Sequence, residues 1–425
     1  MYLEKFAAVL DRYEAFWEHR SIGRPLLNIS ACSDYSWHRN PESVEQKWLD
    51  EELIVNNARG AALHSTYFAE GIPTMFSNLG PGMLAACIGG TFKLAPDTVW
   101  FDQAPVVRDW NDMPKIEFNE QSELWQHLIR IQKRALQDGN FAVSLTDLGG
   151  IMDVVASLRG TEDLLYDLYD NPEEVRAFTM HVRDLWLDAF DRQVQLCGST
   201  GLPYTSWMGF ASRLPWFPLQ CDFCALISPK QFEQFVLEDI VVQTEHMPRS
   251  IYHLDGPGEI PHLDMLLDIP RLNGIQWVAG AGKAALTDPC WFDMYKKMQD
   301  KKKNIVLLGA IDGNHLDAIE RLVKTLDPTG LYLSGWVGNE DDCKRFVENV
   351  TRWCEKRLAH IRYQTTVSRL FPQDGLSRRA HPSIRGCGRF PTDRSQNRYR
   401  GRCPTANPVL PKGMRAEKDI HNTHG

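Results

Sequence analysis

Two residues whose side chains bind metals or transfer protons, His253 and Asp255, lie two positions apart in residues 250–255 (SIYHLD). This run predicts a short buried strand, and residues two apart on a strand point to the same side. Residues 256–258 (GPG) break the strand and begin a helix. A titratable pair at the carboxyl end of a strand is typical of catalytic sites in α/β barrels. The spacing is equally compatible with Asp255 as a helix cap and His253 in a local hydrogen bond.

Polar or aromatic residues also follow the other predicted strands, and we expect them at the same mouth: Asn78, Asp147, Trp207, Trp277, Asp312, Ser334 and Trp336. Asp147 is a candidate acid or base, and equally a candidate cap of a helix over 151–158. Asp312 precedes a glycine, which is ordinary turn chemistry. The three tryptophans would suit a flat or apolar ligand, although aromatic residues also fill cores.

Two further motifs have a structural interpretation beside a functional one. Arg159, in residues 157–160 (SLRG), is able to bind a substrate carboxylate through two parallel hydrogen bonds. A structural ion pair is the alternative. Cys221 and Cys224 form the one CxxC motif of the chain, and without a second CxxC we interpret them as small buried residues.

The pattern of elements that positions these residues alternates between strands and helices. Strands are predicted at 24–30, 72–78, 141–146, 204–207, 250–254, 274–278, 304–309 and 331–334, and helices at 2–20, 43–69, 83–88, 121–138, 172–197, 229–246 and 339–360. About eight strand–helix repeats predict an α/β fold, a (β/α)8 TIM barrel with an N-terminal helical extension. An open doubly wound sheet is the alternative. A dinucleotide-binding version is disfavoured, because no strand is followed by GxGxxG.

Charge divides the chain at about residue 360. The net charge is −8, but residues 361–425 carry thirteen Lys and Arg against four Asp and Glu, so residues 1–360 carry −17. We therefore predict a barrel domain over 1–360 and a basic, Pro- and Arg-rich, disordered tail over 361–425. An acidic body argues against a nucleic-acid partner. An RNA-binding arm and a recombinant or misread extension are alternative interpretations of the tail.

Composition also bears on the compartment. The sequence has no apolar run of about 18 residues that would cross a membrane. The first residues lack the basic and apolar regions of a signal peptide. Ten cysteines without a regular framework indicate reduced thiols. These features predict a cytoplasmic protein with no membrane partner.

Three segments carry a resemblance to a known family: residues 77–82 (SNLGPG), residues 157–160 with 171–174 (SLRG, NPEE), and residues 227–235 leading to 252–256. In this order they resemble the uroporphyrinogen decarboxylase (URO-D) superfamily over about residues 1–360. The likeness is closest to the decarboxylase-like proteins called trimethylamine corrinoid protein 2, and more distant to corrinoid methyltransferases. It implies a TIM barrel.

Departures from the family pattern bear on the activity. Asn78 stands where the resemblance places the essential aspartate of the decarboxylases, and the arginine-rich segment of those enzymes is missing. The corrinoid methyltransferases bind zinc through His-x-Cys and a late cysteine, whereas this chain has His253-x-Asp255 and Ser334. His253 and Asp255 are still able to bind zinc or a harder divalent metal. Candidates for the third ligand are Glu259, Asp222 and Asp147. Without metal, Asp255 would orient His253 for acid–base catalysis.

The resemblance implies methyl transfer between a corrinoid, held on a partner protein, or a small methylated substrate and an acceptor. His253, Asp255 and Asp147 are the expected catalytic residues, and Asn78, Arg159, Trp207, Trp277 and Trp336 the expected substrate-binding residues. A decarboxylase acting on a tetrapyrrole or another carboxylate, and a non-catalytic ligand-binding barrel, are the alternatives.

Overall fold

The computed structural model describes residues 2–101 and 105–370, and their centre is a seven-stranded sheet. Its strands run in the order β2 (Ser65–Ala69), β1 (Leu26–Cys32), β13 (Leu331–Trp336), β12 (Asn304–Asp312), β11 (Gly274–Val278), β10 (Arg249–Asp255) and β9 (Trp216–Leu219). Every neighbouring pair is parallel except β1 and β2. The predicted α/β class with a mostly parallel sheet is therefore confirmed.

The remaining strands are short. β3 (Thr74–Met75) pairs in parallel with β6 (Ala142–Val143), and a parallel bridge joins Ser144 to Thr205 of β7 (Tyr204–Thr205). Two antiparallel pairs complete the set, β4 (Lys93–Leu94) with β5 (Val99–Trp100) and β7 with β8 (Ala211–Ser212). Closure into the predicted eight-stranded barrel is not found among the described residues. The antiparallel β2 occupies the edge of β1, and β3, β6 and β7 are too short to extend the ladder.

One end of the sheet's inner face is filled by α1 (Tyr2–Trp17). Phe16 and Trp17 pack there with Phe210, Val306 and Tyr332. The Trp17 indole also donates a hydrogen bond of 2.9 Å to the Ala211 carbonyl. This apolar plug closes the amino-terminal end of the strands, so polar residues on the inner face lie toward the carboxyl end.

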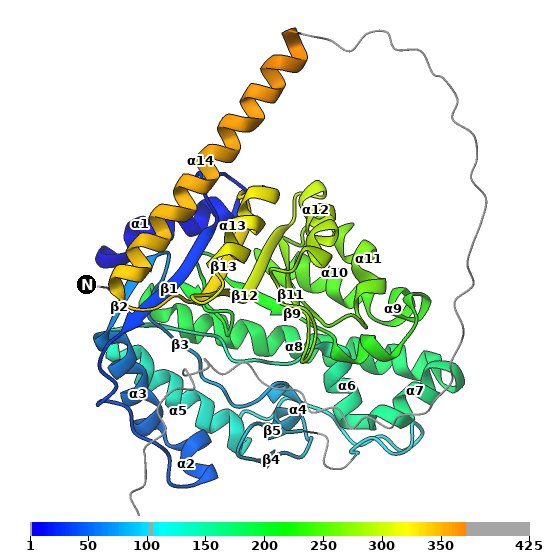
Figure 1. Ribbon diagram of the computed structural model, residues 1–425. Coiled ribbons are helices and arrows are strands. Elements are labelled where there is room, and N and C mark those ends of the chain that lie inside the picture. The colour runs from blue at the N-terminus through cyan, green and yellow to red at the C-terminus, as the bar shows by residue number, and fades with distance from the viewer. Residues whose placement is uncertain (1, 102–104, 371–425) are drawn as a thin grey trace, which may run out of the picture. The chain divides into compact units, whose positions relative to one another are not determined.

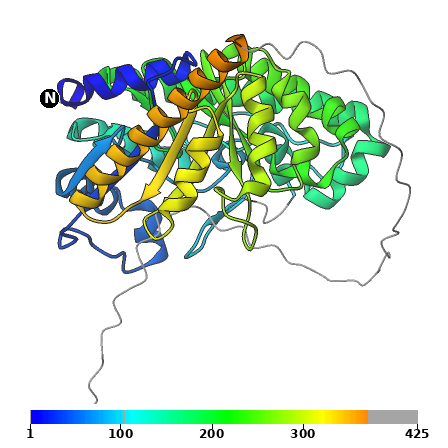
Figure 2. The ribbon, with the colours of Figure 1, turned by 45° about the horizontal axis from the view of Figure 1, so that its top comes forward.

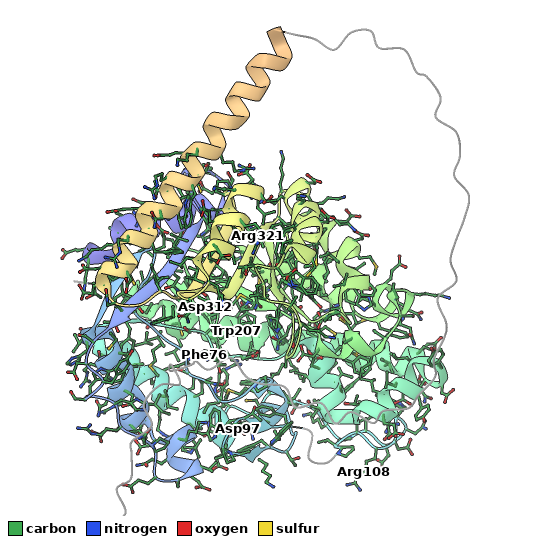
Figure 3. All side chains as sticks on the ribbon, in the orientation of Figure 1. Phe76, Asp97, Arg108, Trp207, Asp312 and Arg321 are labelled. Carbon is green, nitrogen blue, oxygen red and sulfur yellow. The ribbon has the colours of Figure 1, made fainter. Side chains whose placement is uncertain are left out.

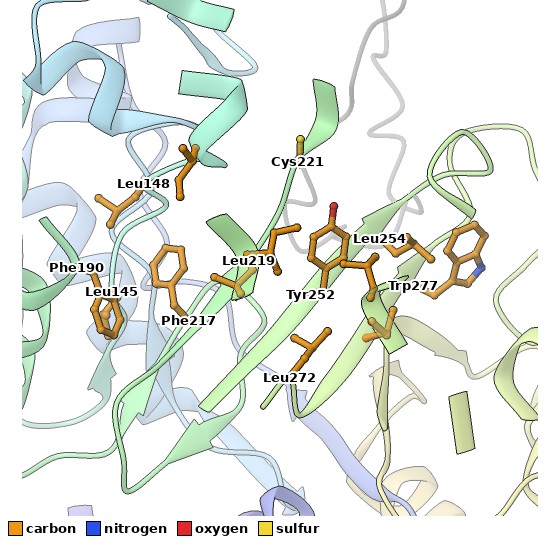
Figure 4. Packing of buried hydrophobic residues seen from close by; sticks show 14 of the residues in the cluster. Leu145, Leu148, Phe190, Phe217, Leu219, Cys221, Tyr252, Leu254, Leu272 and Trp277 are labelled. Atoms are coloured by element: carbon orange, nitrogen blue, oxygen red, sulfur yellow. The ribbon is translucent and has the colours of Figure 1, made fainter. Parts of the chain in front are cut away.

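Helices cover the outer face of the sheet. They are α8 (Pro172–Cys197), α9 (Pro229–Phe235), α10 (Leu237–His246), α11 (Leu263–Leu267), α12 (Phe292–Asp300), α13 (Leu316–Thr325) and α14 (Glu340–Leu370). The turned view shows the C-terminal helices standing in a row over the sheet (Figures 1 and 2). Between the layers lies a continuous apolar core in which Tyr252, Leu254 and Trp277 are fully buried (Figure 4). Alternation along each strand thus separates an outer apolar face from an inner face.

The N-terminal half holds α2 (Val44–Leu49), α3 (Glu51–His64), α4 (Met83–Cys87), α5 (Glu123–Asp138), α6 (Ile151–Arg159) and α7 (Thr161–Asp170). The prediction of one helix over 43–69 was wrong at its end, because residues 65–69 pair with β1 as β2. Their sequence, STYFA, is rich in β-branched and aromatic residues, which favour strands. The helix start at Ser228 is confirmed, with a reciprocal capping box to Gln231.

The long C-terminal helix α14 continues to Leu370, ten residues beyond the predicted end at 360. The prediction of a disordered tail over 361–425 was wrong for residues 361–370, which belong to this helix, and its remainder, residues 371–425, lies outside the described residues. None of the described helices combines the length and the apolar character that a membrane span requires.

Candidate functional site

The carboxyl end of β10 presents two side chains with metal-binding donor atoms on its inner face. His253 and Asp255 are both half-buried, whereas Leu254 between them is buried in the outer core. A third residue, Asp222, comes from the 3₁₀ helix η2 (Asp222–Leu226) that follows β9. One donor atom of each residue lies within 4.8 Å of the other two. Of the three candidates for a third ligand, Asp222 is the residue that the fold brings to the pair.

Two neighbours fix the ring of His253. Gln276 lies opposite it in the parallel register between β10 and β11, and the Gln276 Oε1 atom accepts a hydrogen bond from His253 Nδ1. The Trp207 ring meets the imidazole edge to face, with centroids 4.9 Å apart and an interplanar angle of 89°. Because Nδ1 donates to an amide oxygen, the lone pair of the neutral ring is on Nε2. That nitrogen is the one free to bind a metal or a proton.

A half-buried carboxylate holds the backbone of Asp222 and of the residue after it. Asp153 of α6 accepts the backbone N–H groups of Asp222 at 3.0 Å and Phe223 at 2.8 Å. Burial, followed by the charge of Asp222, raises the pKa of Asp153 to about 8. Gly150 makes room for this contact, because a Cβ there would lie 2.3 Å from both the Asp153 carboxylate and the Gln220 carbonyl oxygen. The position of the Asp222 side chain thus depends on a residue in a different element.

Asp147 follows β6 and belongs to the same end of the sheet. It is buried, and its carboxylate accepts hydrogen bonds from Gly149 N–H at 2.9 Å and Gln220 Nε2 at 3.4 Å. The pKa of Asp147 is raised to about 6, chiefly by burial; the charge of Asp222 adds to this rise, and the charge of His253 opposes it. The structure therefore brings three of the predicted groups, Asp147, His253 and Asp255, into one electrostatic neighbourhood with Asp222.

Asn78 lies in the loop beside Asp147, but its side chain supports a turn. Its Oδ1 atom accepts the Gly80 N–H at 3.0 Å. The loop continues to Met83, whose N–H donates to the Asp147 carbonyl at 3.3 Å. Gly149, at φ +80°, approaches this loop so closely that a Cβ would be 2.7 Å from Gly82 Cα. The substrate-binding role of Asn78 stays a prediction.

Two predicted substrate-binding residues lie elsewhere. Trp277 has no exposed surface and packs against Trp291 in the outer core, with ring centroids 5.1 Å apart. Its neighbour Gln276 occupies the inner face instead. Arg159 donates to Asp167 at 2.6 Å and to the carbonyl of Arg108 at 2.8 Å. Figure 3 shows Arg108 at the periphery and Trp207 toward the middle, so Arg159 makes a structural ion pair away from the site.

The late strands contribute less than the sequence predicts. Trp336 is 48% exposed at the end of β13, opposite Asp312 in the strand register. Asp312, labelled in Figure 3, accepts hydrogen bonds from Asn314 and contacts His315 Nδ1 at 2.7 Å. Its side chain therefore stabilises a local turn. The Ser334 hydroxyl accepts the Gly309 N–H at 3.2 Å. None of the three belongs to the donor group at β10.

Glu259, another candidate ligand, is fully buried behind β10 and stands outside the donor group. Burial raises the pKa of Glu259 well above its usual range. Sequence reasoning missed Gln276 and Asp153, which support His253 and the turn of Asp222 through hydrogen bonds. A signal for Gln276 is its place as a polar residue in the otherwise apolar run of residues 274–278 (GIQWV).

Comparisons with known proteins support the fold. No protein-family profile matches the chain, and no curated protein matches it. The structure is similar to that of a methyltransferase from Methanosarcina mazei, with a TM-score of 0.52 and 12% sequence identity. The similarity covers 81% of this chain and 98% of the other. At this identity the likeness concerns the fold alone. The chain is thus an α/β protein in which Asp222, His253 and Asp255 lie close together at the carboxyl end of the strands.

Proposed function

We propose that this protein is a metal-dependent methyl-transfer enzyme of the URO-D superfamily, in which Asp222, His253 and Asp255 bind one divalent cation. The observation that carries the proposal is the convergence of three donor atoms within 4.8 Å. At metal–ligand distances of 2.0–2.2 Å, neighbouring ligands of one ion lie roughly 3.0–3.6 Å apart, so side-chain shifts on the order of 1 Å would complete the site. On this proposal the seven-stranded sheet and the β3–β6 pair are parts of one barrel, and the parallel bridge between Ser144 and Thr205 extends the β3–β6 pair to β7.

The donor chemistry fits a borderline or hard divalent ion. One imidazole and two carboxylates suit Zn²⁺, Co²⁺, Mn²⁺ or Fe²⁺ better than a soft ion that prefers thiolates. The hydrogen bond from His253 Nδ1 to Gln276 is the outer contact that metal-binding histidines usually make. When bound, such an ion acts as a Lewis acid and lowers the pKa of a coordinated acceptor.

Charge separates this proposal from the decarboxylase alternative. Asp222 is affected by the charges of His253 and Asp255. Asp147 is affected by the charges of Asp222 and His253. A mouth with three carboxylates and one imidazole attracts cations and repels a tetrapyrrole that carries several carboxylates. Asp147, with a pKa of about 6, is able to hold or release a proton near neutral pH. Its role would be proton transfer beside the metal.

The methyl donor is proposed to be a corrinoid, held on a partner protein, or a small methylated molecule. A thermal-shift screen of the purified chain against Zn²⁺, Co²⁺, methylcobalamin and uroporphyrinogen separates the alternatives. A methyl-transfer enzyme is expected to be stabilised by the metal and by methylcobalamin. Stabilisation by uroporphyrinogen alone would favour decarboxylation, and stabilisation by none of them would contradict the proposal. Demethylation of methylcobalamin by the metal-loaded protein, followed spectroscopically with a thiol acceptor, tests the reaction itself.

A further inference from the structure

A second group of reactive side chains lies behind β10, on the side away from the donor site. It consists of Cys221, Cys224, Tyr252 and His262, all of which have 1% or less of their surface exposed. The chain brings them together from the start of η2, from the outer face of β10 and from the 3₁₀ helix η3 (Ile260–His262). Figure 4 shows Cys221 and Tyr252 beside the apolar core. The proposed methyl transfer uses none of these four side chains.

The two cysteines have the backbone geometry that a disulfide requires. The Cys224 N–H donates to the Cys221 carbonyl at 3.1 Å, which makes one 3₁₀ turn. Three residue steps at about 2.0 Å each place the two Cα atoms roughly 6 Å apart. Disulfide-bonded cysteines have Cα atoms 4.4–6.8 Å apart.

Polar groups of Tyr252 and His262 lie beside Cys224. The Tyr252 hydroxyl lies 3.8 Å from it. The His262 Nε2 atom lies 2.9 Å from the Cys224 carbonyl oxygen. Stacking on Phe232, with centroids 4.4 Å apart, holds the ring in place. We therefore take Cys224, whose sulfur lies beside the Tyr252 hydroxyl, as the thiol that reacts first, and Cys221 as the thiol that reacts second.

The turn lies close to the surface although both thiols are buried. Asp222, Ala225 and Leu226 in the same short segment are exposed. Local opening of this one turn would therefore bring a small oxidant to the sulfurs.

We propose that Cys221 and Cys224 form a redox-active dithiol, which hydrogen peroxide converts into a disulfide and a dithiol reductant restores. The Cys224 sulfur attacks one peroxide oxygen, the O–O bond breaks, and a sulfenic acid and one water form. The Cys221 sulfur then displaces the sulfenic oxygen, which leaves as a second water. Two thiols lose two electrons and two protons, and one peroxide is reduced to two waters.

Oxidation would also act on the donor site, because Asp222 lies between the two cysteines. A disulfide would move the Cys224 sulfur away from the Tyr252 hydroxyl, so the turn that carries Asp222 would change conformation. We expect the affinity for Zn²⁺ to change at least fivefold between the two forms. This consequence rests on the proposed function, whereas the disulfide itself does not.

The disulfide is tested in the full chain after treatment with a chelator. The native protein is exposed to hydrogen peroxide and its free thiols are alkylated. The mass of the tryptic peptide 214–230, which contains both cysteines, is then measured by mass spectrometry. We expect this peptide to lose two hydrogens and to escape alkylation, and dithiothreitol to reverse both effects. The variant Cys221→Ser should show no loss of two hydrogens, because oxidation then stops at the Cys224 sulfenic acid. The matched control Cys197→Ser, which removes another buried thiol, should behave as wild type.

Two results would overturn the dithiol proposal. One is full alkylation of Cys221 and Cys224 under conditions that oxidise the exposed Cys290. The other is a disulfide that forms only after denaturation. Zn²⁺ titration of both forms then tests the coupling: equal affinities would refute it. Absence of Zn²⁺ binding to the reduced protein would instead refute the proposed function and leave the disulfide result standing.

Discussion

The Asp153 carboxylate accepts the backbone N–H of Asp222 at 3.0 Å and thereby ties η2 to α6. Its second oxygen accepts the N–H of Phe223 at 2.8 Å. A half-buried residue of another helix thus holds the backbone of the turn that carries the Asp222 carboxylate. His253 has a comparable support in Gln276. The donor site is assembled by these outer contacts as much as by the donors themselves.

Replacing Asp153 tests this support. Asp153→Asn keeps the size of the side chain but turns one acceptor oxygen into a donor that faces an N–H group. We expect the affinity for Zn²⁺ to fall about 10-fold or more, as is usual when an outer contact is lost. Calorimetric titration measures the affinity. The matched control is Asp312→Asn, which removes a strand-end carboxylate outside the donor group. An unchanged affinity in Asp153→Asn would show that Asp222 does not depend on this contact.

Gln276 is expected to act through the tautomer of His253. Gln276→Leu removes the acceptor at Nδ1 and should weaken Zn²⁺ binding about 10- to 100-fold. Gln276→Glu keeps an acceptor and should restore most of the binding. Titrations of both variants check the pair. Equal losses in the two variants would point to packing rather than to hydrogen bonding as the role of Gln276.

Replacing Trp277 should affect mainly the stability of the fold, and replacing Trp207 should affect mainly metal binding. Trp277→Ala removes a fully buried side chain and should lower the free energy of unfolding by about 3–5 kcal/mol. Metal binding by the folded variant should be close to that of wild type. Trp207→Ala removes the ring beside His253 and should affect metal binding more than Trp277→Ala does. Urea unfolding and metal titration of both variants provide the readouts, and the reverse pattern would contradict the placement of the two rings.

Asp147 gives a prediction about pH in the metal-free protein. Its pKa is raised from 3.8 to about 6, so between these values the folded chain binds more protons than the unfolded chain. Stability should therefore fall by up to about 3 kcal/mol as the pH rises from 4 to 6, and this loss persists above pH 6. Asp147→Asn has no carboxyl group to titrate and should not show this loss. The stability of the variant, compared with that of wild type at the same pH, should therefore be higher at pH 7 than at pH 4. Urea unfolding at pH 4 to 7 with chelator tests this, and parallel pH profiles would refute it.

The sequence predicts those parts of the site that depend on local pattern. His253 and Asp255 follow from the two-residue period of one buried strand that ends at Gly256. Trp277 shows the limit, because placing it at the mouth instead of Gln276 is an error of one residue. Such an error exchanges the two faces of a strand. Which residue faces inward is determined by pairing between strands, here His253 with Gln276, and this is not a local property.

Asp222 could be named only as one of three candidate ligands, for a related reason. It follows β9, whose four residues (WFPL) are all buried, include a proline and show no alternation. The strand was therefore missed, and with it the turn that carries Asp222. Closure of the barrel was overpredicted because residues 72–78 and 141–146 look like full strands. Only Thr74–Met75 and Ala142–Val143 of them form a ladder.

The most direct test of the account is the metal content of the purified full-length chain. Elemental analysis and calorimetric titration are made after loading with Zn²⁺ or Co²⁺, on wild type and on the variants Asp222→Asn, His253→Ala and Asp255→Asn. Asp312→Asn serves as the matched control. We predict one equivalent of metal in wild type and in the control, and at least a tenfold loss of affinity in each of the three donor variants, with unfolding transitions retained. Wild-type protein that stays free of metal after loading, or donor variants that bind as tightly as wild type, would contradict the proposed centre.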